Sequence, residues 1–203
     1  MSNDYGVVPL RPTRTAAVDD ATSIARLHMD RLPQGFLPTL GFRALRRLYR
    51  HLVKSDHAFV LVADDDEGVV GYVAVAEDTR RVYREFLRHD GVVAALVAAP
   101  AALRTPRQVW ETVRYGGRAD HEGLPAAEIL AIAVSVRARG EGMARRLLDA
   151  GLEELRRREI DAARVVTATG NAQALRVYER AGFRRQRFIE VHRGVRQEVL
   201  VWP

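Results

Sequence analysis

The transition from a strand to a helix around two glycines is the feature that most constrains the fold. Residues 128–134, EILAIAV, form an apolar run typical of a buried strand. Apolar residues then recur at helical spacing, which predicts an amphipathic helix over Glu141–Glu159. Gly140 and Gly142 lie where the strand gives way to the helix. A strand that feeds directly into a helix is typical of a sheet covered by helices, the layered α/β and α+β classes.

The rest of the chain continues this alternation. Turn residues such as proline and glycine separate the segments. Asp19 or Asp20 is expected to cap the first helix. The predicted segments are a strand at 7–13, helices at 18–32 and 40–53, a hairpin at 57–77, helices within about 78–124, a strand at 163–169, a helix at 171–182 and a hairpin at 183–202. This order predicts one mixed sheet flanked by helices.

Composition excludes several classes of protein. A chain of 203 residues is long enough for one packed domain. It has no cysteine, so disulfides, thiolate metal sites and a cysteine nucleophile are excluded. Its six histidines show no ligand spacing, and we expect no metal. No signal peptide or membrane-spanning stretch is visible, so we expect a cytoplasmic protein with no membrane partner.

The charge of the chain is basic and carried by arginine. The formal net charge is +6, and Lys54 is the one lysine. The arginines are scattered among 26 acidic residues, whereas nucleic-acid binders gather their positive charge on one face, so nucleic acid is not an expected partner. Either an anionic ligand or a solvated arginine-rich surface accounts for this composition.

The glycine pair has two possible interpretations. A helix start carries unpaired N–H groups and a partial positive charge, which favour an anion, and glycine lets a ligand approach the backbone closely. The pattern is not a P-loop, and Arg145 occupies the third glycine position of a dinucleotide fingerprint. A phosphate cradle and an ordinary tight turn both remain open on this motif alone.

A second motif lies in the predicted helix at 171–182. Asn171, Ala174 and Tyr178 are spaced by three and seven residues, which places them on one side of a helix. Taken singly, Asn171 is a possible helix cap and Tyr178 a possible core aromatic residue. Gly182 is suited to the position after the helix end.

Together the two motifs resemble the GNAT superfamily of acetyl-CoA-dependent N-acetyltransferases. RGEGMA at 139–144 is similar to its pyrophosphate-binding motif, and NAQALRVYERAGF at 171–183 to its C-terminal motif. Ala144, where glycine is commoner, and Val136, where proline often stands, depart from the pattern. The resemblance implies a mixed, mostly antiparallel sheet with splayed central strands. We expect a single domain over residues 1–203, with a helical insert at about 78–124, where the chain departs from the minimal plan of this family.

The resemblance also implies a binding site and a mechanism. Acetyl-CoA is expected in the gap between the splayed strands, with its pyrophosphate on the helix start. The expected cofactor-binding residues are Ile132, Ala133, Val134, Arg139, Gly140, Glu141, Gly142, Met143, Ala144, Arg145 and Asn171. Tyr178 is the expected proton donor to the leaving sulfur. Glu128 is the candidate general base, with a strand-edge ion pair as its alternative role.

The acceptor is less constrained than the cofactor. The leading hypothesis is a small primary amine, such as an amino sugar or a nucleotide-linked amino sugar. The alternatives are a protein N-terminus or lysine, or a non-catalytic acetyl-CoA-binding module. The insert is expected to cover the acceptor pocket, because Tyr83, Phe86, Trp110 and Tyr115 lie among arginines there. A homodimer interface and simple packing on the sheet are the other roles considered for it.

Overall fold

The computed structural model describes residues 12–89, 123–192 and 195–203. Within these residues the strands form one sheet in the order β1-β2-β3-β4-β5-β7-β6. β4 and β5 pair in parallel, and every other neighbouring pair is antiparallel. The strands are β1 Thr13–Thr15, β2 Ala58–Asp65, β3 Gly68–Ala76, β4 Ala127–Val134, β5 Ala163–Ala168, β6 Arg184–His192 and β7 Val195–Trp202.

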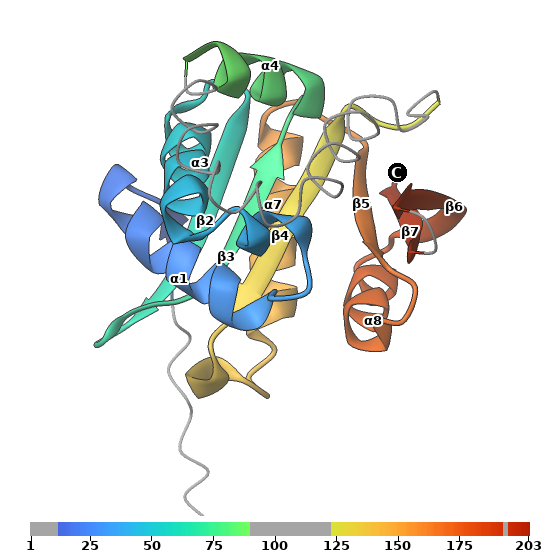
Figure 1. Ribbon diagram of the computed structural model, residues 1–203. Helices are drawn as coiled ribbons and strands as arrows, with labels where there is room; N and C mark the ends of the chain where they lie inside the picture. The colour runs from blue at the N-terminus through green and yellow to red at the C-terminus, as the bar shows by residue number, and fades with distance from the viewer. Residues whose placement is uncertain (1–11, 90–122, 193–194) are drawn as a thin grey trace, which may run out of the picture.

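Helices cover both faces of this sheet (Figure 1). They are α1 Ala21–Arg31, α2 Phe36–Thr39, α3 Phe42–Lys54, α4 Thr79–His89, α7 Met143–Arg157 and α8 Ala172–Arg180. Two short 3-10 turns, η1 Val18–Asp20 and η2 Val136–Ala138, precede α1 and the glycine pair. The predicted mixed, mostly antiparallel sheet with flanking helices is confirmed.

Two apolar cores hold the layers together. On one face, α1 and α3 pack on β2, β3 and β4, around residues such as Ile24, Leu45 and Val62. On the other face, α7 and α8 pack on the sheet around Leu147, Leu155 and other apolar side chains. Because both faces of the sheet are covered, every residue of β3 from Val70 to Ala76 is buried.

The centre of the sheet is irregular. β4 pairs with β5 through three residue pairs, Ala127 to Ile129, and the two strands then diverge (Figure 1). At the same point the register between β3 and β4 shifts by one residue, so that Leu130 is a β-bulge. Leu130 and Ala131 therefore both face the core under α1 and α3, while Ile132 returns to the α7 side. The predicted splay of the central strands thus begins at Leu130.

Some predicted details differ from the structure. α7 begins at Met143, two residues after the predicted start, because Gly140 and Gly142 have positive φ angles outside the helical region. Asp20 does not cap α1 through its side chain; its carboxylate instead binds Arg14 and the N–H of Ala17. α4 is the described part of the predicted helical insert. Trp110 and Tyr115 lie outside the described residues, as do residues 7–11 of the strand predicted at 7–13. The described strand β1 begins at Thr13, the last residue of that prediction.

Candidate active site

The open edge of β4 provides unpaired backbone groups at the splay. Ser135 donates its N–H to Val70 of β3 (2.7 Å), and backbone groups alternate in direction along a strand. Ala133 therefore also faces β3, whereas the N–H and C=O groups of Ile132 and Val134 face the gap left by β5. Extended groups of this kind can pair with an elongated amide-containing ligand as a further strand would.

The loop after β4 is built around the two glycines. Gly140 has φ 83° and Gly142 has φ 68°, a left-handed conformation that favours glycine, and Gly142 is the N-cap of α7. A Cβ atom added at either glycine would meet nothing within 4 Å. The glycines are therefore required by the backbone conformation, and the space beside them is open.

The start of α7 has free donors. Arg146 is the first residue of α7 whose N–H group donates to a backbone carbonyl of a described residue. The acceptor is the carbonyl of Gly142 (3.1 Å). The N–H groups of Met143, Ala144 and Arg145 precede it and lie at the positive end of the helix dipole. With the open space beside the glycines, this arrangement suits the pyrophosphate of acetyl-CoA.

The arginine side chains of this segment differ in their contacts. Arg139 is exposed and is not in an ion pair with any described residue. Arg145 binds Asp149 (2.8 Å) and the carbonyl of Arg180 at the end of α8 (2.7 Å). Arg139 is thus available for an anion, while the Arg145 side chain braces α7 against α8 and only its N–H is free for a ligand. Glu141 is half-buried between the glycines.

Tyr178 lies on the inner side of α8. It is 8% exposed and packs at 5.5 Å between ring centroids against Phe183. Burial raises the pKa of its hydroxyl above the ordinary value of 10, so the proton stays in place at neutral pH. Its hydroxyl makes no hydrogen bond with any other described residue. A protonated hydroxyl without a partner among the described residues, on the helix that follows β5, is suited to donate a proton.

Asn171 caps the helix that carries Tyr178. Its Oδ1 accepts a hydrogen bond from the N–H of Ala174 (3.2 Å), which fixes the start of α8. Asn171 is exposed, and its amide N–H₂ group points to no described partner. The capping role foreseen as the simpler alternative is therefore present, and the donor end of the same amide remains available to a ligand.

Glu128 is the centre of a half-buried polar cluster on β4. Its Oε2 accepts hydrogen bonds from Arg164 Nε (3.0 Å), Arg164 Nη2 (2.7 Å) and Thr79 Oγ1 (3.1 Å). Arg164 is 3% exposed and also donates to the carbonyl of Pro125. The ion pair considered as an alternative role for Glu128 is thus present. All three bonds use Oε2, which leaves Oε1 without a bond to the described residues.

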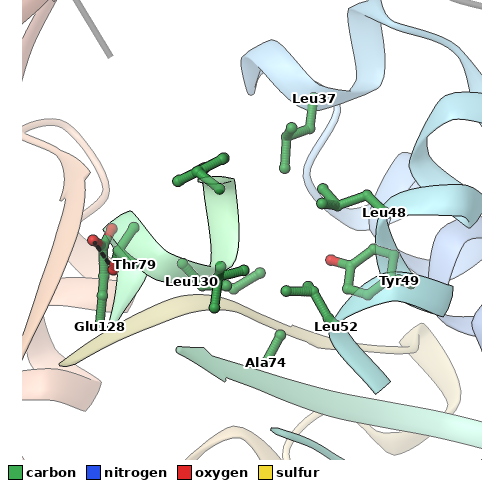
Figure 2. A pocket seen from close by; sticks show the side chains of 11 residues that line it. Leu37, Leu48, Tyr49, Leu52, Ala74, Thr79, Glu128 and Leu130 are labelled. Atoms are coloured by element: carbon green, nitrogen blue, oxygen red, sulfur yellow. Dashed lines mark hydrogen bonds between the residues drawn. The ribbon is translucent and has the colours of Figure 1, made fainter. Parts of the chain in front are cut away.

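A pocket joins Glu128 to the splay (Figure 2). Its empty space is about 520 Å³, including solvent at the mouth. The lining residues come from α2, α3, α4, β3 and β4: Leu37, Leu48, Tyr49, Leu52, Ala74, Thr79, Val82, Tyr83, Glu128, Leu130 and Ala131. Figure 2 shows Glu128 and Thr79 together at one end and Tyr49 across the cavity from them. Since Leu130 and Ala131 mark the start of the splay, the pocket meets the expected cofactor gap there.

A second polar cluster lies behind the pocket. His28 Nδ1 is 2.6 Å from the Tyr49 hydroxyl and 2.8 Å from the Tyr72 hydroxyl, and the two hydroxyls are 2.8 Å apart. The three side chains come from α1, α3 and β3 and are almost fully buried. Burial lowers the pKa of His28 to about 4, so its imidazole is neutral at pH 7. This cluster ties both covering helices to the sheet.

Sequence analysis missed these partners. Arg164 stands alone in the apolar run ARVVTA, and a charge in a buried strand signals a buried counter-charge. Tyr72 is likewise the one hydroxyl in GVVGYVAVA. His28, Tyr49 and Thr79 have no comparable signal, because their partners are distant in the sequence.

Comparisons with known proteins identify acetyltransferases as relatives of this chain. The model of the acetyltransferase (GNAT) family matches residues 22–183. A mycothiol acetyltransferase from Propionibacterium freudenreichii subsp. shermanii is 35% identical over 133 residues, 65% of this chain and 38% of the relative. The chain thus spans well under half of that relative.

Two solved structures share the fold. The ribosomal-protein-S18-alanine N-acetyltransferase from Escherichia coli has a TM-score of 0.60 at 10% identity, covering 96% of this chain and 94% of the other. The NatC complex bound to Gag peptide and CoA has a TM-score of 0.60 at 15% identity, covering 95% and 97%. In the part of the chain that the structure describes, no helix combines the length and the apolar character needed to cross a membrane.

Proposed function

Because the chain belongs to the GNAT acetyltransferase family, an acyltransferase family that uses acetyl-CoA, we propose that it transfers the acetyl group to the primary amine of a small molecule. The observation that carries the proposal is the combination of the open glycine loop with the gap between β4 and β5. Acetyl-CoA, when bound, supplies the activated acetyl thioester. A cytoplasmic location, where acetyl-CoA is available, is part of the proposal.

The glycine loop and β4 would hold the two ends of the cofactor. The N–H groups of Met143, Ala144 and Arg145 donate to the pyrophosphate, and exposed Arg139 adds a charge-assisted bond. Along β4, the backbone groups of Ile132 and Val134 pair with the pantetheine arm. An N–H group of β4 near Val134 is placed to polarise the thioester carbonyl, where negative charge develops.

Tyr178 would supply the proton for the leaving sulfur. Reference pKa values of about 10 for tyrosine and 8.5 for a thiol make this transfer uphill by about 2 kcal/mol in water. Burial raises the pKa of Tyr178 further, so its hydroxyl would hold the proton until a strongly basic leaving group formed beside it. The raised pKa also keeps Tyr178 protonated throughout the neutral range.

Glu128 is proposed to receive the proton of the acceptor amine. Its free Oε1 is the atom that would face the amine, while Arg164 and Thr79 fix Oε2. An ammonium group must lose a proton before it can attack, and a carboxylate held beside the start of the splay is placed to accept it, directly or through a water. Arg164 is a positioning residue in this scheme.

The narrower features of the proposal concern the acceptor and the insert. We treat residues 1–203 as a single acetyltransferase domain whose insert at about 78–124 borders the acceptor pocket. Thr79, Val82 and Tyr83 of α4 line that pocket, which supports a role in acceptor binding. An amino sugar remains the acceptor predicted from the arginines and aromatic residues of the insert. No metal is proposed to take part.

Cofactor binding can be tested with a matched pair of glycine variants. Gly140 and Gly41 have φ angles of 83° and 86°, and an added Cβ meets nothing within 4 Å at either position. Gly140→Glu and Gly41→Glu both place a side chain at a glycine with positive φ, but only the first places a side chain and a negative charge at the proposed pyrophosphate site. Calorimetric titration with acetyl-CoA should show weaker binding for Gly140→Glu than for Gly41→Glu by at least tenfold. Equal affinities would refute the cofactor site.

A further inference from the structure

The walls of the acceptor pocket are mostly apolar. Leucine, valine and alanine side chains from α2, α3, α4, β3 and β4 account for seven of its lining residues: Leu37, Leu48, Leu52, Ala74, Val82, Leu130 and Ala131. The empty space of the pocket is about 520 Å³ when the solvent at its mouth is included. A surface of this composition gains most from an apolar occupant.

The polar groups of the pocket are few and mostly engaged. The Tyr49 hydroxyl is held by His28 and Tyr72, and Thr79 Oγ1 donates to Glu128. Glu128 Oε1 has no partner among the described residues. The hydroxyl of Tyr83, which also lines the pocket, makes no hydrogen bond with another described residue. The pocket therefore offers two free polar groups, this hydroxyl and Glu128 Oε1, and Oε1 lies at the end next to the splay, where an amine would have to lie.

The described lining also lacks a positive charge. No lysine, arginine or histidine is among the lining residues of the described chain, and Arg164 is already paired with Glu128. A phosphate or carboxylate on the acceptor would be desolvated here without a counter-charge. The hydroxyls of a sugar would likewise find few partners, because a buried polar group without a hydrogen bond is unfavourable.

We propose that the acceptor is an alkylamine or arylalkylamine, whose apolar group lies between α3, α4 and β4 and whose nitrogen lies at Glu128 Oε1. This inference rests on the proposed function, since it takes the pocket as the acceptor site. It names an acceptor class different from the amino sugar predicted from the insert.

A series of amines tests the acceptor class. With acetyl-CoA at saturation, CoA release is measured for propylamine, butylamine, pentylamine, phenethylamine and glucosamine. Each added methylene that enters an apolar site is worth about 0.8 kcal/mol, so kcat/KM should rise about fourfold per methylene from propylamine to pentylamine. Glucosamine should be at least tenfold poorer than pentylamine. A flat chain-length dependence or a preference for glucosamine would overturn the inference.

A pair of leucine variants locates the apolar group. Leu48 of α3 lines the pocket, whereas Leu27 of α1 packs on the same core outside it, and both are half-buried. Leu48→Gln should raise KM for pentylamine at least tenfold with acetyl-CoA affinity unchanged, and Leu27→Gln should leave both unchanged. Equal effects of the two variants on KM would overturn the inference.

These outcomes separate the inference from the proposed function. If acetyl-CoA binds but glucosamine is the better acceptor, the acetyltransferase assignment stands and the apolar acceptor class fails. If acetyl-CoA does not bind to the wild-type protein in calorimetry, the proposed function itself fails. If acetyl-CoA binds and none of the amines is acetylated, the apolar acceptor class is wrong.

Discussion

Acid should destabilise the protein through one buried histidine. His28 is 4% exposed and lies against the hydroxyls of Tyr49 and Tyr72, and burial lowers its pKa to about 4. In the unfolded chain its pKa is close to 6.5. Between these two values the unfolded state binds a proton that the folded state does not, so stability must fall as the pH drops from 6.5 towards 4.

The size of this effect follows from the two pKa values. Each tenfold difference in proton affinity is worth about 1.36 kcal/mol, so the contribution of His28 is about 3 kcal/mol between pH 7 and pH 4. This is a large share of the 5–15 kcal/mol that stabilises a typical domain. Tyr49 and Tyr72 do not titrate in this range, because burial raises the pKa of both above 10.

His28→Gln tests the prediction, because glutamine offers the tyrosines a polar partner that does not titrate. His89 on α4 is exposed, so His89→Gln is the control. The free energy of unfolding is measured from urea denaturation, followed by tryptophan fluorescence, at several pH values from 4 to 7.5. The loss of stability on acidification should shrink by about 3 kcal/mol in His28→Gln and remain unchanged in His89→Gln. Acidic residues contribute equally to the pH dependence of the wild type, His28→Gln and His89→Gln. If the free energy of unfolding depends on pH in the same way in all three, the buried, neutral state of His28 is refuted.

Substitutions at four other positions, one of them combined with a change at Arg164, have defined outcomes. At Gly71 of β3 a Cβ would lie 2.9 Å from Leu147 Cδ1, whereas at Gly151 of α7 it would meet Val73 and Val75 at 3.6 Å. Gly71→Ala should therefore lower the free energy of unfolding by about 1–3 kcal/mol, and Gly151→Ala should raise it by about 0.5–1 kcal/mol. Urea denaturation measures both changes. A more stable Gly71→Ala protein and a less stable Gly151→Ala protein would contradict the packing. Tyr178→Phe should keep acetyl-CoA affinity and lower the single-turnover rate about 10²- to 10⁴-fold, and an unchanged rate would leave Tyr178 a packing residue. Glu128→Gln should lower activity, because the proposed base is lost, and thermal stability, because Arg164 loses its counter-charge. The double variant Glu128→Gln/Arg164→Met should recover thermal stability but not activity. Recovery of both would exclude Glu128 as the base.

Local patterns predicted much of the framework. The helix predicted at 40–53 corresponds to α3, in which Leu45, Tyr49 and Leu52 are buried. The hairpin predicted at 57–77 is formed by β2 and β3. The glycine loop was predicted because Gly140 and Gly142 mark a backbone conformation that other residues adopt with strain.

The sequence did not predict which residues distant from one another along the chain would be in contact. Glu128 was singled out, but its ion pair depends on Arg164, which β5 brings beside it through parallel pairing of strands 36 residues apart. The bulge at Leu130 leaves no local signal either, because an extra residue in an apolar strand does not change its composition. The pocket beside Glu128 is lined by five elements, so its apolar character could be seen only in the folded structure.

The short pairing of β4 with β5 has a consequence for folding cooperativity. Among the residues that the structure describes, three residue pairs join β4 to β5, so few backbone hydrogen bonds resist separation of the two parts of the sheet. Amide protons of β5 should consequently exchange through local openings that leave β2 and β3 protected. A ligand that pairs with the free edge of β4 would act as a removable strand, and its binding free energy would add to the stability of the whole domain. Saturation with acetyl-CoA is therefore expected to slow amide exchange in β5 more than in β2.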